Sequence, residues 1–117
     1  MTFDILTLFP KMFVGPFDFS IVKRAQEKNL VKINLRDLRK YAVDERGSVD
    51  DRPYGGGAGM ILRIEPIYKA VQVLNSKIKR RLKSGSKNNR IILFSTRGKK
   101  FNQNTAKRLS KYKNLIP

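Results

Sequence analysis

The sequence contains no cysteine and no histidine. The lack of cysteine excludes disulfide bridges, thiolate nucleophiles and cysteine-ligated zinc. The lack of histidine excludes Ser-His-Asp and Cys-His catalytic sites and the HExxH metal site. Carboxylates, lysine, arginine and tyrosine are left for acid–base chemistry. We therefore expect no metal centre and no histidine-dependent enzyme.

Acidic residues are lacking from the second part of the chain. All nine lie between Asp4 and Glu65, where 11 lysines and arginines accompany them, whereas residues 66–117 carry 15 basic residues and no acid. The net charge is +17. Positive charge at this density repels itself unless a polyanion lies close, and nucleic acid and anionic membrane are the candidate partners. A merely solvated basic surface is the alternative interpretation.

Long apolar runs are also lacking. No run approaches the length of about 20 residues that crosses a bilayer. The apolar opening, residues 1–13, contains Asp4 and Lys11 and has neither a basic start nor a small-residue cleavage site, so it is not typical of a signal peptide. We expect a cytoplasmic protein without a membrane partner.

The length of 117 residues corresponds to one domain with one modest core. Apolar patterning predicts strands over residues 3–9, 31–35 and 90–94, and a further apolar run opens at Leu115 and stops almost as it starts. Helical spacing predicts helices over 21–28, with Ser20 as N-cap and Asn29 as stop, over 64–78 and over 102–112. Strands alternating with helices predict an α/β fold, an open and mainly parallel sheet with flanking helices.

Two segments lack this periodicity. Residues 44–60 form a glycine-rich loop, whose length itself indicates function or disorder. Residues 75–90 combine a basic helix end with a Ser/Gly/Asn turn, and we expect them to form a basic surface linker. The aromatic side chains near these segments are expected to be core or half-buried, namely Tyr68, Phe94, Phe101 and Tyr112.

The glycines from Gly55 to Gly59 do not match the common phosphate-binding patterns. Met60 stands where GxGxxG requires glycine, no strand directly precedes the run, and no Gly-Lys-Ser/Thr follows. A flexible turn is the plain interpretation of the glycines taken alone.

The wider stretch VDDRPYGGGAGM, from Val49 to Met60, resembles the signature loop of the bacterial tRNA (guanine-N1)-methyltransferases, the TrmD-type members of the SPOUT superfamily. The resemblance runs nearly end to end and includes ILTLFPKMF at 5–13, SIVKRAQEKNL at 20–30, NLRDL at 34–38, EPI at 65–67 and LFSTRG at 93–98. It implies methyl transfer from S-adenosylmethionine to N1 of the guanosine on the 3′ side of the tRNA anticodon. It also implies a homodimer with the active site between the subunits.

The chain departs from the family pattern at three places. Ser95-Thr96-Arg97-Gly98 replaces Ser-Pro-Gln-Gly, so Ser95 and Gly98 carry over as cofactor-binding residues while Arg97 adds charge. Arg46-Gly47-Ser48 replaces His-Arg-Thr on the RNA-contacting side. The resemblance stops short of the Cys-Gly-Arg-Tyr-Glu-Gly segment. It therefore implies a single partial SPOUT domain over residues 1–117 without the C-terminal trefoil knot or the family's catalytic Asp and Arg, and this chain is expected to be inactive alone.

The resemblance implies that Asp50, Gly57 and Gly59 help form the pocket around the guanosine of the tRNA substrate. Guanine N1 must lose a proton as the methyl group arrives, which requires a carboxylate base, but the plain interpretation of Asp50 and Asp51 is that one of them braces the loop. Lys79, Arg80 and Arg81 are expected to contact RNA phosphates. The alternative function is a non-catalytic basic RNA-binding module of the same fold. A basic structural protein of a ribonucleoprotein would share the charge but not the glycine signature.

Overall fold

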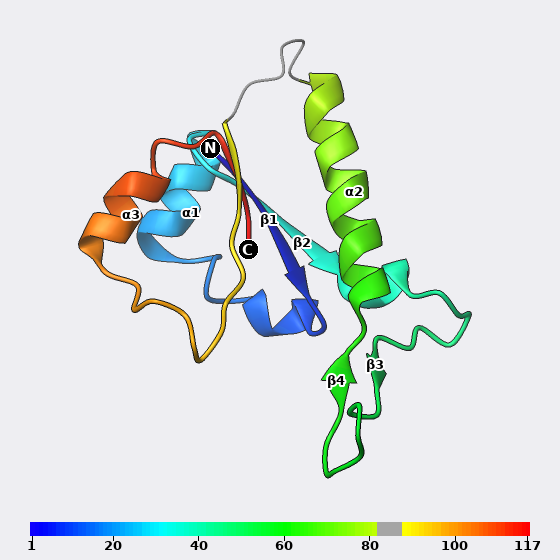
Figure 1. Ribbon diagram of the computed structural model, residues 1–117. Helices are drawn as coiled ribbons and strands as arrows, with labels where there is room; N and C mark the ends of the chain where they lie inside the picture. The colour runs from blue at the N-terminus through cyan, green and yellow to red at the C-terminus, as the bar shows by residue number, and fades with distance from the viewer. Residues whose placement is uncertain (82–87) are drawn as a thin grey trace. The chain divides into compact units, whose positions relative to one another are not determined.

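The computed structural model describes residues 1–81 and 88–117 (Figure 1). The chain divides into two compact units, Met1–Arg36 with Gly85–Pro117, and Asp37–Ser84. In the described residues, no helix combines the length and the apolar character needed to cross a membrane. The expectation of a single domain stays a prediction.

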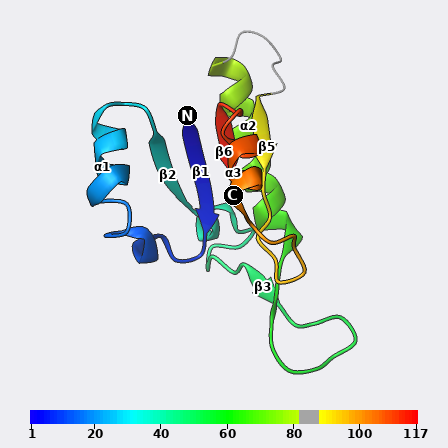
Figure 2. The same ribbon diagram turned by 90° about the vertical axis from the view of Figure 1, so that its left-hand side faces the viewer.

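The first unit is built on a four-stranded sheet. Its strands are β1 (Thr2–Thr7), β2 (Lys32–Asp37), β5 (Asn89–Ile91) and β6 (Asn114–Ile116), in the order β2-β1-β6-β5. β6 pairs in parallel with β1, where Phe3 lies opposite Leu115, and with β5, where Arg90 lies opposite Leu115. The arrows of β1 and β2 also run in the same direction (Figure 2). This confirms the predicted α/β fold with a mainly parallel sheet.

The position of β6 differs from the sequence-based expectation of an unfinished strand. β6 lies inside the sheet, with a hydrogen-bonded neighbour on each side, and Leu115 and Ile116 are buried. The N–H of Ile92 donates to the Ile116 carbonyl at 2.8 Å, and the N–H of Leu6 donates to the Pro117 carbonyl at 3.0 Å. The apolar run from Leu115 is therefore the centre of the sheet.

Two α-helices and a short 3-10 helix, η1 (Pro10–Phe13), accompany this sheet. In α1 (Ser20–Glu27) the predicted N-cap is wrong, because the extended Phe19 is the capping residue and Ser20 is the first helical residue, with a φ of 55°. Asn29 ends the helix as predicted, with a φ of 56°. α3 (Gln103–Leu109) begins after Asn102, whose side chain accepts a hydrogen bond from the N–H of Thr105 at 2.9 Å, and it ends before the predicted residue 112.

The second unit contains the 3-10 helix η2 (Leu38–Tyr41), the two-residue strands β3 (Asp50–Asp51) and β4 (Ile61–Leu62), and helix α2 (Ile64–Arg81). α2 packs against η2. Ala70 and Leu74 of the predicted apolar stripe are buried, as are Leu38 and Val49.

The basic segment predicted over residues 75–90 begins with a helix end, as expected, and its role as a linker stays a prediction. α2 continues to Arg81 and β5 begins at Asn89, so both ends of the predicted segment belong to regular elements. Residues 82–87 lie outside the described part of the chain.

A buried carboxylate joins the first two strands. Asp4 is 5% exposed, and its Oδ1 accepts hydrogen bonds from Asn34 Nδ2 at 3.0 Å, from Arg36 Nε at 3.1 Å and from Arg36 Nη2 at 2.9 Å. Buried charges of this kind are tolerated when they are paired and hydrogen-bonded. Asp4 thus links β1 to β2 through side chains as well as through the backbone.

Replacing Asp4 with alanine should lower the free energy of unfolding by about 3 kcal/mol, because Arg36 and Asn34 lose their acceptor. The value is taken from the low end of the range for broken buried pairs, since the Arg36 side chain is 31% exposed. Urea denaturation followed by circular dichroism measures the change. The matched control is Glu27→Ala, which breaks an exposed pair with Lys23 at 3.9 Å and should cost about 0.5 kcal/mol or less. Equal losses for the two variants would contradict the assignment.

Candidate functional site

The glycine-rich loop is carried by a short hairpin that periodicity did not predict. Asp50 pairs with Leu62, and Asp51 with Ile61, in an antiparallel arrangement. Residues 52–60 form the connection between the two strands and extend away from them (Figures 1 and 2). Strands of two residues are too short to show an alternating pattern.

The two neighbouring aspartates of β3 have different surroundings. Asp51 Oδ2 forms an ion pair with Arg63 Nη2 at 3.0 Å, and its Oδ1 accepts a hydrogen bond from the N–H of Arg52 at 2.8 Å. The Asp50 side chain is exposed and has no hydrogen bond or ion pair with the described residues. Successive side chains of a strand point to opposite faces. The loop-bracing role considered for this pair therefore belongs to Asp51, and the Asp50 carboxylate is free to meet a ligand.

Gly57 and Gly59 are required by backbone conformation. Their φ angles are 112° and 98°, in the region that residues with a Cβ rarely adopt. No heavy atom lies within 4 Å of the position that a Cβ would occupy on either residue. The space beside these glycines is open, so their backbone is accessible to a ligand.

A hollow of about 240 Å³ lies beside the hairpin. It brings together polar and apolar side chains, namely Asp51, Tyr54, Ile61, Leu62, Arg63, Ile64 and Glu65. Asp50, Gly57 and Gly59 do not line it. Arg63 was not singled out in the sequence, where the only indication is its charge, opposite to that of Asp51 across the loop.

A second turn, between Asp44 and Ser48, precedes the hairpin at the Arg46-Gly47-Ser48 departure from the family pattern. The N–H of Ser48 donates to Asp44 Oδ1 at 2.7 Å. Hydrogen bonds from Ser48 lower the pKa of the Asp44 carboxyl, and the bond from the Ser48 side chain contributes more than the one from its backbone. A charged Asp44 therefore stabilises this turn.

Ser95 and Gly98, the predicted cofactor residues, form one tight turn. The N–H of Gly98 donates to the Ser95 carbonyl at 2.9 Å, and the N–H of Arg97 donates to Ser95 Oγ at 3.2 Å. A Cβ on Gly98 would lie 3.0 Å from the Ser95 carbonyl oxygen, a tight contact that favours glycine in this turn. The exposed Ser95 hydroxyl keeps its own proton available for a ligand.

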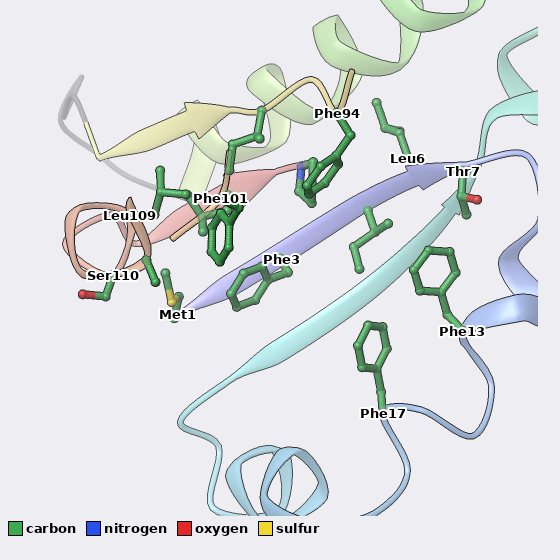
Figure 3. A pocket seen from close by; sticks show the side chains of 15 residues that line it. Met1, Phe3, Leu6, Thr7, Phe13, Phe17, Phe94, Phe101, Leu109 and Ser110 are labelled. Carbon is green, nitrogen blue, oxygen red and sulfur yellow. The ribbon is translucent and has the colours of Figure 1, made fainter. Parts of the chain in front are cut away.

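An apolar hollow of about 520 Å³ lies in the first unit (Figure 3). Phe3, Phe94, Phe101 and Leu109 are among its lining residues, and Thr7 and Ser110 are its only lining residues with a polar side chain. Ser95 and Gly98 do not line it. The predicted cofactor residues lie instead in the turn that follows Phe94.

The aromatic residues expected to be core or half-buried are only partly so. Phe94, Phe101 and Tyr68 are 76%, 62% and 60% exposed, whereas Tyr112 is half-buried. The prediction is wrong for the first three. Strand and helix periodicity indicate which face of an element a residue occupies but not whether another element covers that face.

The predicted phosphate contacts Lys79, Arg80 and Arg81 belong to the last turn of α2, and their side chains are not described. Their role stays a prediction. Other basic side chains that are described and exposed include Lys99, Lys100, Lys107, Arg108 and Lys111.

Three comparisons relate this chain to known proteins. A family model described as tRNA (Guanine-1)-methyltransferase TrmD matches residues 1–117. A tRNA (guanine-N(1)-)-methyltransferase of Dictyoglomus turgidum is 47% identical over 113 residues, which cover 97% of this chain and 42% of that protein. The corresponding protein of Carboxydothermus hydrogenoformans is 45% identical over 117 residues, which cover 99% of this chain and 42% of that protein.

A solved structure gives the same result. The crystal structure of tRNA (m1G37) methyltransferase from Aquifex aeolicus superimposes with a TM-score of 0.77 at 34% identity, covering 99% of this chain and 49% of that chain. The chain thus spans less than half the length of each of these relatives. Because the family model matches every residue from 1 to 117, the chain belongs to the TrmD family of tRNA (guanine-1)-methyltransferases.

Proposed function

We propose that this chain supplies the guanosine-side loop of a tRNA (guanine-N1)-methyltransferase, which uses S-adenosylmethionine to methylate the guanosine 3′ of the anticodon. The observation that carries the proposal is the unpartnered, exposed carboxylate of Asp50 at the base of an open glycine loop. Membership of the TrmD family over the full chain supports it. A cytoplasmic location follows from a tRNA substrate.

Guanine suits a carboxylate on its Watson–Crick edge. That edge presents the N1 proton and the exocyclic amino group as donors, whereas adenine has an acceptor at N1. An ionised carboxylate is acceptor-only, so Asp50 would bind guanine and reject adenine. The accessible backbone beside Gly57 and Gly59 would line the same base. Asp50 is a binding residue in this proposal, and the base that removes the N1 proton belongs to the parts of the family that resemblance places after residue 117.

The turn from Ser95 to Gly98 fits one side of a cofactor site. The Ser95 hydroxyl proton can donate to a ligand, and the exposed turn offers backbone groups. S-adenosylmethionine, when bound, would supply an electrophilic methyl group. The resemblance also supports a homodimer in which the site is shared between subunits, and we include it in the proposal.

The chain alone should bind S-adenosylmethionine weakly, with a Kd above about 1 mM. Small-molecule sites bury 70–90% of their ligand, whereas residues 93–100, which include the turn, are all exposed. Isothermal titration calorimetry measures the affinity. Micromolar binding would contradict the expected weak binding, and the loss of that binding in Gly98→Ala, which crowds the turn, would then show whether the site lies at this turn.

Binding of tRNA by the chain should weaken steeply with salt. If about four to six phosphates are engaged, the slope of log K against log salt is about −3 to −4, on the single-strand coefficient. Replacing Lys79, Arg80 and Arg81 together with alanine should flatten the slope by about 2, whereas Asp50→Ala should leave it unchanged. Filter binding at several salt concentrations measures all three.

The matched control for that experiment is a triple alanine variant of Lys23, Arg24 and Lys28, which removes the same charge from α1 and its C-cap, where acids are also present. It should change the slope less. Salt-insensitive binding, or no binding of tRNA, would overturn the proposed function. Phosphate-dependent binding with no contribution from Asp50 to the choice between guanosine and adenosine would favour the non-catalytic RNA-binding module.

A further inference from the structure

The loop over residues 52–60 has little to fix its position from within. The N–H of Gly56 donates to the Pro53 carbonyl at 3.1 Å, and no other backbone hydrogen bond joins two of these residues in the described structure. Tyr54 is 96% exposed and Met60 is 59% exposed. The position of the loop must therefore be set where it joins the hairpin.

At that junction one carboxylate connects the two ends of the loop. Asp51 precedes the loop and Arg63 follows it, and their Oδ2 and Nη2 atoms are 3.0 Å apart. The other oxygen of Asp51 accepts a hydrogen bond from the N–H of Arg52, the first loop residue, at 2.8 Å. Asp51 therefore binds both Arg52, the first residue of the loop, and Arg63, the residue that follows β4.

Arg63 is in turn attached to a buried part of the chain. Its N–H donates to the carbonyl of Val49 at 2.8 Å, and Val49 is fully buried. Its Nε is buried without a hydrogen-bond partner in the described structure. Among the described residues, the Asp51 carboxylate is therefore the only acceptor that this guanidinium contacts.

We propose that Arg63 is a positioning residue, which holds the loop from Arg52 to Met60 through its ion pair with Asp51 and so fixes Gly57, Gly59 and the adjacent Asp50 for the substrate. The first half of this inference concerns the loop alone. The second half rests on the proposed function, because it takes guanosine as the ligand.

Amide hydrogen exchange of the purified chain, followed by NMR, tests the first half. Arg63→Gln should speed exchange at Arg52 and Gly56, the loop residues whose N–H groups are hydrogen-bonded, by about two- to fivefold, the factor that corresponds to an ion pair of partial exposure. Exchange at Ala70 and Leu74 in α2 should not change. A merely structural role would instead speed exchange in the helix and the loop together.

Two further measurements show whether the ion pair is responsible. Arg63→Lys keeps the charge and should restore most of the protection, and about 1 M salt should give the wild-type chain the loop exchange of Arg63→Gln, because salt screens partly exposed pairs. The control Lys69→Gln removes one exposed positive charge from α2 and should leave the loop unaffected. Unchanged exchange at Arg52 and Gly56 in Arg63→Gln would overturn the proposal.

The second half is tested with an anticodon stem-loop RNA that carries guanosine at the methylated position. Arg63→Gln should weaken its binding by about two- to fivefold more than Lys69→Gln does, since both variants lose one charge and only the first releases the loop. Equal weakening in the two variants, together with changed loop exchange, would overturn the role in substrate positioning. If the wild-type chain binds no RNA, the proposed function fails, and the exchange data alone decide whether Arg63 holds the loop.

Discussion

The sheet of the first unit depends on the hydrogen bonding of β6 along both of its edges. β6 lies between β1 and β5 and pairs with both, so without it β5 would have no strand to pair with and the sheet would lose that edge. The side chains of Leu115 and Ile116 add buried apolar surface at the same place. Burial on this scale stabilises a sheet more than the propensity of any single strand. The turn that contains Ser95 and Gly98 begins four residues after the end of β5, and so the same pairing helps to position the cofactor candidate.

In the second unit, two adjacent carboxylates of one strand serve different purposes. Asp51 is used inside the molecule, where it is paired with Arg63, and Asp50 is left without an intramolecular partner among the described residues. The alternation of a strand separates them although they are neighbours in sequence. A short hairpin can thus combine a fixed attachment and a free ligand-binding group within two residues, while η2 and α2 provide the packed support.

The sequence was informative where local chemistry decides the structure. Asn29 ends a helix because it tolerates a left-handed backbone, and the apolar stripe of α2 is buried at Ala70 and Leu74. Non-local features could not be predicted in this way. The central place of β6 depends on partners far away in the chain, and the pairing of Arg63 with Asp51 depends on a hairpin whose strands are too short to show periodicity. The exposure of Phe94 depends on whether another element packs against it, which the periodicity of its own segment does not show.

The open space around Gly57 and Gly59 has a consequence for how this loop can change during evolution. A base change at the first or second position of a glycine codon gives a stop codon or a codon for a residue with a Cβ, and each such residue would have to adopt a φ near 112° or 98°. There is room for the new side chain, yet the backbone would be strained. Missense variants at these two codons should therefore be purged for a conformational reason, even where the side chain they introduce touches nothing.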